Sequence, residues 1–326
     1  MTTTLTLFTP AGALAQAAPL KLAAKRLTAL GFDVAIDADA LARHQRFGGD
    51  DATRLAALHR VATERPSIAM ATRGGYGMTR LMDQIDWKLL AKSVEHGTRW
   101  VGLSDLTALH LGLLAHGKVS SWAGPLACED FGRTEEDGGV DDVTQDCFTE
   151  AMSGALEAVG FRETSGFRTA NGWGFDGLGE KGVLWGGNLA LVNSLLGTPH
   201  WPKVKGGILF LEDINEHPYR VERMLIQLQQ AGVLDAQKAV VLGDFGGWTK
   251  SPNDRGYNLK SAIAAVQART KTPILTGLPF GHIRTKVSLP VGVRVELLVQ
   301  GRDVLIGWEG EHEHHGHDHG HQQHAH

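Results

Sequence analysis

Short apolar runs alternate with longer amphipathic stretches in the N-terminal half of this 326-residue chain, and no other feature limits the fold as strongly. Runs typical of strands lie at residues 5–8, 32–36, 67–71, 99–103 and 119–122. Stretches with helical character lie at about 20–31, 50–63 and 143–156, and another follows residue 104. This alternation predicts a parallel sheet with helices on both faces, and such sheets bind ligands at the carboxyl ends of their strands.

The C-terminal half predicts a second α/β domain with a mixed and more β-rich sheet. An apolar helix follows Gly186-Gly187-Asn188, and strand-like runs lie at 207–211, 239–242, 274–275 and 293–299. Residues 160–179 are polar and glycine-rich without periodicity, which is typical of a connection between domains. We therefore predict an N-terminal domain at 1–160, a linker at 161–181, a C-terminal domain at 182–310 and an active site between the two domains.

The composition excludes several classes of partner. A net charge of −4 gives no electrostatic reason to expect nucleic acid or an anionic membrane. The N-terminus has no signal-peptide pattern, and no segment has the ~18 apolar residues of a membrane span. Two cysteines, Cys128 and Cys147, are too few for a disulfide framework, so we expect buried structural thiols in a cytoplasmic protein.

Residues 311–326 carry half of the sixteen histidines, together with glycine and acidic residues. This composition cannot form a core and predicts a disordered tail. Such a tail has the ligands for Zn or Ni, independently of any active site. The histidines that we expect as ligands there are His312, His314, His315, His317, His319 and His321.

A serine lies at the predicted turn between the strand at 99–103 and the helix that follows. In this position Ser104 would expose its hydroxyl beside the first free N–H groups of the helix, which suits a nucleophile that needs an oxyanion site. The alternative is an ordinary N-cap serine. The stretch Gly102-Leu103-Ser104-Asp105-Leu106 lacks the second glycine of the G-x-S-x-G elbow, which argues against an ordinary α/β-hydrolase.

A serine nucleophile needs a base, and the base needs a group that orients it. His282 lies in a Pro- and Gly-shaped loop after a strand and is our candidate base, whereas His110 fits a packing role and His217 is a weaker candidate. Glu212 ends the apolar run 208–211, where a carboxylate could orient an imidazole. The alternative role for such an acid is to cap the helix that begins near residue 218, and Asp213 fits that role better.

The loop Arg73-Gly74-Gly75-Tyr76-Gly77 follows another predicted strand. It lacks the lysine and the spacing of a P-loop, so we do not expect a phosphate cradle. We instead interpret the loop as part of an oxyanion hole, with one backbone N–H from Gly75 and one from Asp105, the residue after the nucleophile. Arg73 could form a structural ion pair or bind a substrate carboxylate, and the sequence does not separate these roles.

Several short motifs occur in a fixed order between residues 5 and 300, and together they resemble the LD-carboxypeptidase family of serine peptidases. The motifs are Arg73-Gly74-Gly75-Tyr76-Gly77, Gly102-Leu103-Ser104-Asp105, Gly186-Gly187-Asn188-Leu189, Leu196-Gly197-Thr198-Pro199, Leu211-Glu212-Asp213 and Gly281-His282. The resemblance implies a Ser-Glu-His triad, which falls on Ser104, Glu212 and His282, and a cleft between the two domains.

The resemblance also implies an activity, the removal of the terminal D-alanine from cytoplasmic murein tetrapeptides without a cofactor or an active-site metal. The same family includes microcin-immunity peptidases that cleave a peptidyl-nucleotide, and the sequence does not separate the two substrates. A non-catalytic metal-binding protein that uses the His-rich tail is the alternative from another class. Whether the chain forms a homodimer stays open.

Overall fold

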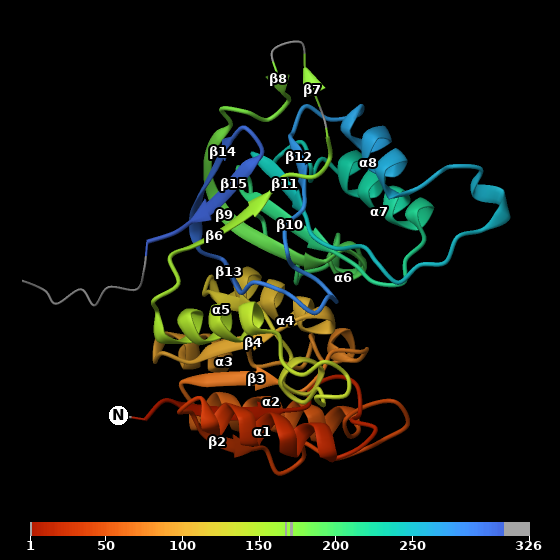
Figure 1. Ribbon diagram of the computed structural model, residues 1–326. Coiled ribbons are helices and arrows are strands. Elements are labelled where there is room, and N and C mark those ends of the chain that lie inside the picture. The colour runs from red at the N-terminus through yellow and green to blue at the C-terminus, as the bar shows by residue number, and fades with distance from the viewer. Residues whose placement is uncertain (1, 167, 170–171, 310–326) are drawn as a thin grey trace, which may run out of the picture.

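The computed structural model describes residues 2–166, 168–169 and 172–309, and it folds them into two α/β domains (Figure 1). The N-terminal domain contains a six-stranded sheet with the strand order β13-β5-β4-β3-β1-β2. Its strands are parallel except for β13, which is antiparallel to β5. The bounds are β1 Thr4–Phe8, β2 Asp33–Ile36, β3 Ile68–Ala71, β4 Arg99–Gly102, β5 Ser121–Ala123 and β13 Leu289–Val291.

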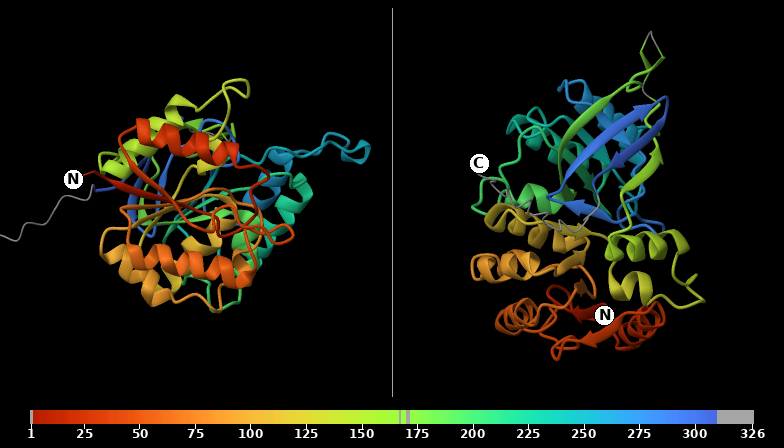
Figure 2. Two further views of the ribbon diagram at one scale, coloured as in Figure 1. Left: turned by 90° about the horizontal axis from the view of Figure 1, so that it is seen from below. Right: turned by 90° about the vertical axis from the view of Figure 1, so that its left-hand side faces the viewer.

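Helices cover both faces of this sheet, as the alternating pattern predicts. Figure 2 shows α1 and α5 on one face and α2, α3 and α4 on the other. Because it is covered on both sides, β3 is buried along its whole length and is apolar at every position. The bounds are α1 Ala18–Ala29, α2 Asp51–Glu64, α3 Trp87–Glu95, α4 Thr107–Gly112 and α5 Asp142–Ser153.

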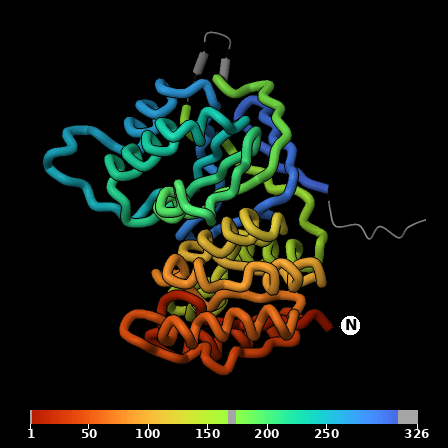
Figure 3. Tube along the Cα trace, turned by 180° about the vertical axis from the view of Figure 1, so that it is seen from behind, coloured from red at the N-terminus to blue at the C-terminus, as the bar shows by residue number. Residues whose placement is uncertain are grey.

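The C-terminal domain contains a seven-stranded mixed sheet with the order β12-β11-β10-β9-β14-β15-β6. The strands β9 to β12 are parallel, whereas β14, β15 and β6 are antiparallel additions. The strand bounds are β6 Ala158–Arg162, β9 Gly179–Asn188, β10 Ile208–Glu212, β11 Ala239–Leu242, β12 Ile274–Thr276, β14 Arg294–Gln300 and β15 Asp303–Gly307. The helices are α6 Leu189–Leu195, α7 Pro218–Gln230 and α8 Leu259–Gln267. Figure 3 shows the segment between β11 and α8 projecting from the body of the domain.

The chain passes between the domains more than once. β6 at 158–162 belongs to the C-terminal sheet, whereas β13 at 289–291 returns to the N-terminal sheet. The stretch predicted as a linker holds a small hairpin, β7 Arg168–Thr169 and β8 Gly172–Trp173, and the start of β9. The domain boundaries of the sequence analysis stay a prediction. The six candidate tail histidines lie outside the described residues.

Two further expectations concern single features. Cys128 and Cys147 are free and buried, as expected of structural thiols. No helix in the part of the chain that the structure describes is long and apolar enough to cross a membrane.

Candidate active site

Ser104 lies at a strained turn between β4 and α4. The chain leaves β4 at Gly102, stays extended at Leu103 (φ −139°), and enters the left-handed region at Ser104 (φ +64°) before a 3₁₀ turn, Ser104–Leu106. A side chain rarely adopts this conformation, and such strain is typical of functional turns. Leu103 occupies the N-cap position, so Ser104 is not the N-cap serine of the alternative interpretation.

The glycine loop between β3 and the next turn lies directly against Ser104. A Cβ on Gly74 would lie 2.6 Å from Ser104 Cβ and 2.9 Å from Ser104 Oγ, so only glycine fits there without movement. The Gly12 N–H donates to the Gly74 carbonyl at 3.0 Å and fixes the loop from its other side. Gly75 has φ +103°, a conformation that favours glycine. The two predicted turns therefore form one local structure.

Asp105 joins the serine turn to the glycine loop through its side chain. Its carboxylate is fully buried, and Oδ2 accepts a hydrogen bond from the Met78 N–H at 2.7 Å. Burial raises the pKa of Asp105 to about 6, although the Met78 hydrogen bond and the charge of Arg54 act in the opposite direction. From the sequence, only the backbone N–H of Asp105 was predicted to take part in the site. A carboxylate placed directly after a candidate nucleophile was the signal that could have indicated this structural role.

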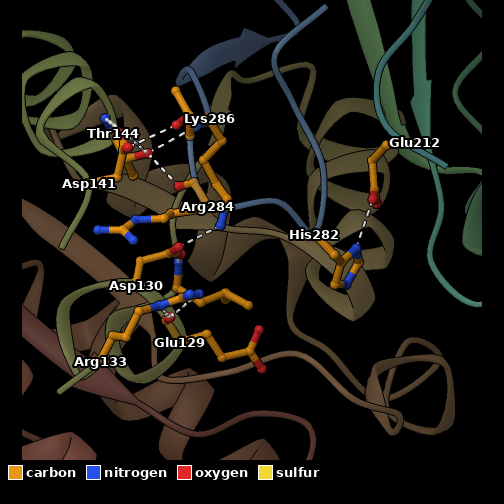
Figure 4. Close-up of polar contacts among 11 residues, drawn as sticks. Glu129, Asp130, Arg133, Asp141, Thr144, Glu212, His282, Arg284 and Lys286 are labelled. Atoms are coloured by element: carbon orange, nitrogen blue, oxygen red, sulfur yellow. Dashed lines mark hydrogen bonds and ion pairs between the residues drawn. The ribbon is translucent and has the colours of Figure 1, made fainter. Parts of the chain in front are cut away.

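Glu212 and His282 form a hydrogen-bonded pair in which the carboxylate is fully buried and the imidazole is partly exposed. Glu212 is the last residue of β10 and is fully buried, and its Oε2 lies 2.8 Å from His282 Nδ1 (Figure 4). Gly281 has φ +138°, and a Cβ there would lie 3.2 Å from Glu212 Oε2, so a glycine before the histidine lets the loop approach the carboxylate. The contact leaves Nε2 as the ring nitrogen available for proton transfer.

The pKa of His282 reflects a balance between burial and its acidic neighbours. Burial lowers this pKa, but the hydrogen bond and charge of Glu212, with a smaller effect of Glu129, outweigh burial. The pKa is therefore raised above the ordinary value of 6.5. An imidazole that can gain a proton near neutral pH is suited to general acid and base catalysis.

Two residues to which the sequence analysis gave no role connect this pair to the serine turn. The Asn188 backbone N–H donates to Thr107 Oγ1 at 2.9 Å, and the Asn188 side chain donates to Glu212 Oε1 at 3.2 Å. A Cβ on Gly187 would lie 2.4 Å from Thr107 Oγ1, so this close approach requires glycine. Among the described residues no direct hydrogen bond joins Ser104 to His282, and the bridge through Thr107 and Asn188 holds their elements together.

The segment after His282 is fixed to the N-terminal domain (Figure 4). The Lys286 ammonium pairs with the buried carboxylate of Asp130. Thr144 Oγ1 donates to the Arg284 carbonyl at 2.9 Å and accepts from the Lys286 N–H at 2.8 Å. These contacts and the pairing of β13 with β5 limit the movement of the loop that carries the histidine.

The other acid and base candidates have structural roles. Both ring nitrogens of His110 are bonded, to Ser121 Oγ and the Gly102 carbonyl, and burial lowers its pKa to about 4, which confirms the packing role. His217 is the N-cap of α7 and pairs with Asp254. The prediction that Asp213 caps α7 is wrong: His217 is the N-cap, and Asp213 Oδ2 accepts instead from the Ala190 N–H at the start of α6 (2.9 Å).

Arg73 is the first residue of the glycine loop, and its side chain contacts Ala13 and Glu129. Its Nη1 donates to the Ala13 carbonyl at 3.0 Å, and its Nε lies 3.9 Å from Glu129 Oε1. Burial and the neighbouring Asp130 raise the pKa of Glu129, with Arg73 acting against them. No cluster of metal-ligating side chains is present in the described ranges, which exclude the tail.

Comparisons with known proteins identify the family. The LD-carboxypeptidase N-terminal domain matches residues 5–124, and the LD-carboxypeptidase C-terminal domain matches residues 181–297. The chain belongs to the LD-carboxypeptidase family. The Ser104 turn lies in the first matched region, and the Glu212–His282 pair lies in the second.

Known members of the LD-carboxypeptidase family are similar to this chain over most of its length. The muramoyltetrapeptide carboxypeptidase of Oxalobacter formigenes has a crystal structure that is 38% identical, with a TM-score of 0.82, over 94% of this chain and 99% of that one. The murein tetrapeptide carboxypeptidase of Pseudomonas aeruginosa is 29% identical over 88% of this chain and 90% of that protein. The microcin C7 self-immunity protein MccF of Escherichia coli is 25% identical over 73% of this chain and 72% of that protein.

Proposed function

We propose that this protein is a serine L,D-carboxypeptidase that removes the terminal D-alanine from murein tetrapeptides in the cytoplasm. The observation that carries the proposal is the hydrogen-bonded Glu212–His282 pair, which Asn188 and Thr107 connect to the helix that follows the Ser104 turn. The names of two similar proteins, in Oxalobacter formigenes and Pseudomonas aeruginosa, supply the substrate class.

In the proposed reaction His282 takes the proton of Ser104 as the hydroxyl attacks the scissile carbonyl. Glu212 holds the imidazole through Nδ1 and stabilises its cation, in keeping with the raised pKa of His282. The backbone N–H groups of Gly75 and Asp105 hold the oxyanion. His282 then protonates the departing amine of D-alanine, and water activated by the same imidazole hydrolyses the acyl-enzyme.

Two structural features support these assignments. The left-handed turn at Ser104 places its side chain against Gly74, one residue before Gly75. Asp105 is the second residue of a 3₁₀ turn, where a backbone N–H has no partner within the helix. Both proposed oxyanion donors therefore belong to elements in contact with the nucleophile.

Mass spectrometry of a murein tetrapeptide, before and after incubation with the protein, tests the proposal. We expect the wild-type protein to release D-alanine and the Ser104→Ala variant to release none. An unchanged tetrapeptide after incubation with folded wild-type protein would contradict the proposed substrate.

A peptidyl-nucleotide is the second candidate substrate, because MccF is similar over 73% of this chain. The same incubation with an aminoacyl sulfamoyl nucleoside separates the candidates. Cleavage of this compound without D-alanine release would favour the immunity-type activity. Cleavage of neither, by a protein whose tail binds Zn or Ni, would favour the non-catalytic alternative.

A further inference from the structure

A cavity of about 240 Å³ lies beside the glycine loop, on the side of the N-terminal domain formed by the loops after β1, β2 and β3. Three arginines line it, Arg43, Arg46 and Arg73, with Gly12, Gly75 and Tyr76. No acidic residue is among its lining residues. Three arginines thus line one small concave surface in a protein whose net charge is −4.

The arginines of this cavity differ from their neighbours in how their charges are balanced. Within the described ranges Arg43 and Arg46 form no ion pair, whereas the nearby Arg54 and Arg80 both pair with Asp51. Arg73 Nε is buried, and no residue that the structure describes accepts a hydrogen bond from it. Arg43 and Arg46 have no carboxylate partner among the described residues, and the carboxylate beside Arg73 is Glu129 at 3.9 Å. The like charges repel each other, so an anion in the cavity would relieve an unfavourable arrangement.

The loops around the cavity are held in place by backbone contacts. The Ala13 N–H donates to the Arg46 carbonyl at 2.9 Å, and Gly12 bridges to Phe47 and bonds the Gly74 carbonyl. The Arg46 guanidinium lies 5.8 Å from the centre of the Tyr76 ring. The backbone positions that carry the arginines are therefore formed before a ligand binds, which lowers the ordering cost of binding.

The cavity begins at Gly75, the residue after the glycine that contacts the proposed nucleophile. Gly74 lies against Ser104 Oγ, and Gly75 lines the cavity. Adjacent Cα atoms across a trans peptide are about 3.8 Å apart. In a carboxypeptidase substrate the free carboxylate is likewise one residue beyond the scissile carbonyl, so the spacing of the loop matches the spacing of the substrate.

We propose that the cavity lined by Arg43, Arg46 and Arg73 binds the C-terminal carboxylate of the peptide substrate. This inference rests on the proposed function and extends it from the reacting bond to the basis of exopeptidase specificity. A guanidinium fork matches a carboxylate with two parallel charge-assisted hydrogen bonds, which an amide or a continuing peptide chain cannot replace. Arg73 would then bind substrate, in addition to its contacts with Ala13 and Glu129.

Binding to the full-length Ser104→Ala protein tests the inference without turnover. Isothermal titration calorimetry compares a murein tetrapeptide with the same peptide carrying a C-terminal amide, at low salt. We expect the free acid to bind at least tenfold more tightly than the amide, because a hydrogen bond to a charged group contributes about 1.5–3 kcal/mol and 1.4 kcal/mol is tenfold.

Variants of the arginines then test whether this cavity causes the preference for the free acid over the amide. Arg46→Gln and Arg43→Gln in the Ser104→Ala background should weaken binding of the free acid and leave binding of the amide unchanged, and Arg46→Lys should restore part of the loss. Arg80→Gln is the matched control, since its charge is balanced by Asp51 and it does not line the cavity. In otherwise wild-type protein, Arg46→Gln should raise KM much more than it lowers kcat.

The outcomes separate the inference from the function on which it rests. Equal binding of acid and amide, or arginine variants that bind both peptides like the parent, would overturn the inference while D-alanine release still supports the function. Failure of the Ser104→Ala protein to bind the tetrapeptide, together with no release by the wild type, would overturn both.

Discussion

Replacing Gly74 with alanine tests whether the glycine loop and the Ser104 turn form one active site. Gly74 lies outside the positive-φ region, so its backbone accepts alanine without conformational strain. The added methyl would instead lie 2.6 Å from Ser104 Cβ, an atom fixed by the backbone of the turn. The substitution therefore acts through one defined steric contact with the proposed nucleophile.

The size of the effect follows from this distance. Carbon atoms pack at about 3.5–4.0 Å, so the loop or the serine must move by about 1 Å to accept the methyl. A displacement of this size at a reacting group costs about 100-fold in rate. Overpacking a buried contact also costs about 1–3 kcal/mol of unfolding free energy, which lowers the Tm by several degrees without unfolding the chain at 25 °C.

Steady-state kinetics of D-alanine release and thermal unfolding measure the two effects on the same protein. We expect kcat to fall about 100-fold in Gly74→Ala while the Tm falls by several degrees. Gly160→Ala is the control, because its Cβ would meet only the Val304 carbonyl at 3.9 Å and its φ is not positive. A folded Gly74→Ala protein with wild-type kcat would refute the steric reasoning and remove the glycine loop from the site.

Three further changes test the roles of Glu212, Asp105 and the C-terminal tail. Glu212→Gln removes the charge that raises the pKa of His282, so the acid limb of the kcat/KM pH profile should move to lower pH. The plateau of the same profile should fall about 100-fold. An acid limb at the wild-type pH would contradict the pairing of Glu212 with His282. Asp105 has a pKa of about 6 when folded and an ordinary value of 3.8, so the folded state binds more protons and loses stability as pH rises through this interval. Asp105→Asn keeps an acceptor for the Met78 N–H, so its free energy of unfolding in urea should exceed that of the wild type by up to about 3 kcal/mol at pH 8 and by little at pH 4. An equal change in this free energy at both pH values would rule out a buried charge. Removing residues 311–326 should leave D-alanine release unchanged, and loss of activity would show that the tail takes part.

The parts of the fold that the sequence predicted depend on local pattern. Buried parallel strands such as β3 and β10 are short apolar runs, and a Ser between a strand and a helix is visible within a few residues. His110 was predicted to pack inside, and its two hydrogen bonds and lowered pKa confirm this. In each case the neighbours along the chain determine the environment.

The parts that the sequence did not predict depend on contacts between distant segments. Asn188 and Thr107 are 81 residues apart, and nothing near either residue indicates that one bonds the other. β13 contains Pro290 and pairs with β5 at the edge of a sheet formed by the other half of the chain. Asp213 was assigned to the wrong helix because Ala190, whose N–H it accepts, lies 23 residues before it.

In the proposed reaction Ser104, with His282 as base, forms a covalent acyl-enzyme with the murein peptide. Rapid quenching of the reaction with tetrapeptide, followed by digestion and mass spectrometry, reveals the modified residue. We expect an adduct with the mass of the peptide lacking D-alanine on Ser104, and no adduct in Ser104→Ala or His282→Ala. An adduct on another residue, or D-alanine release by Ser104→Ala at the wild-type rate, would contradict the proposed reaction.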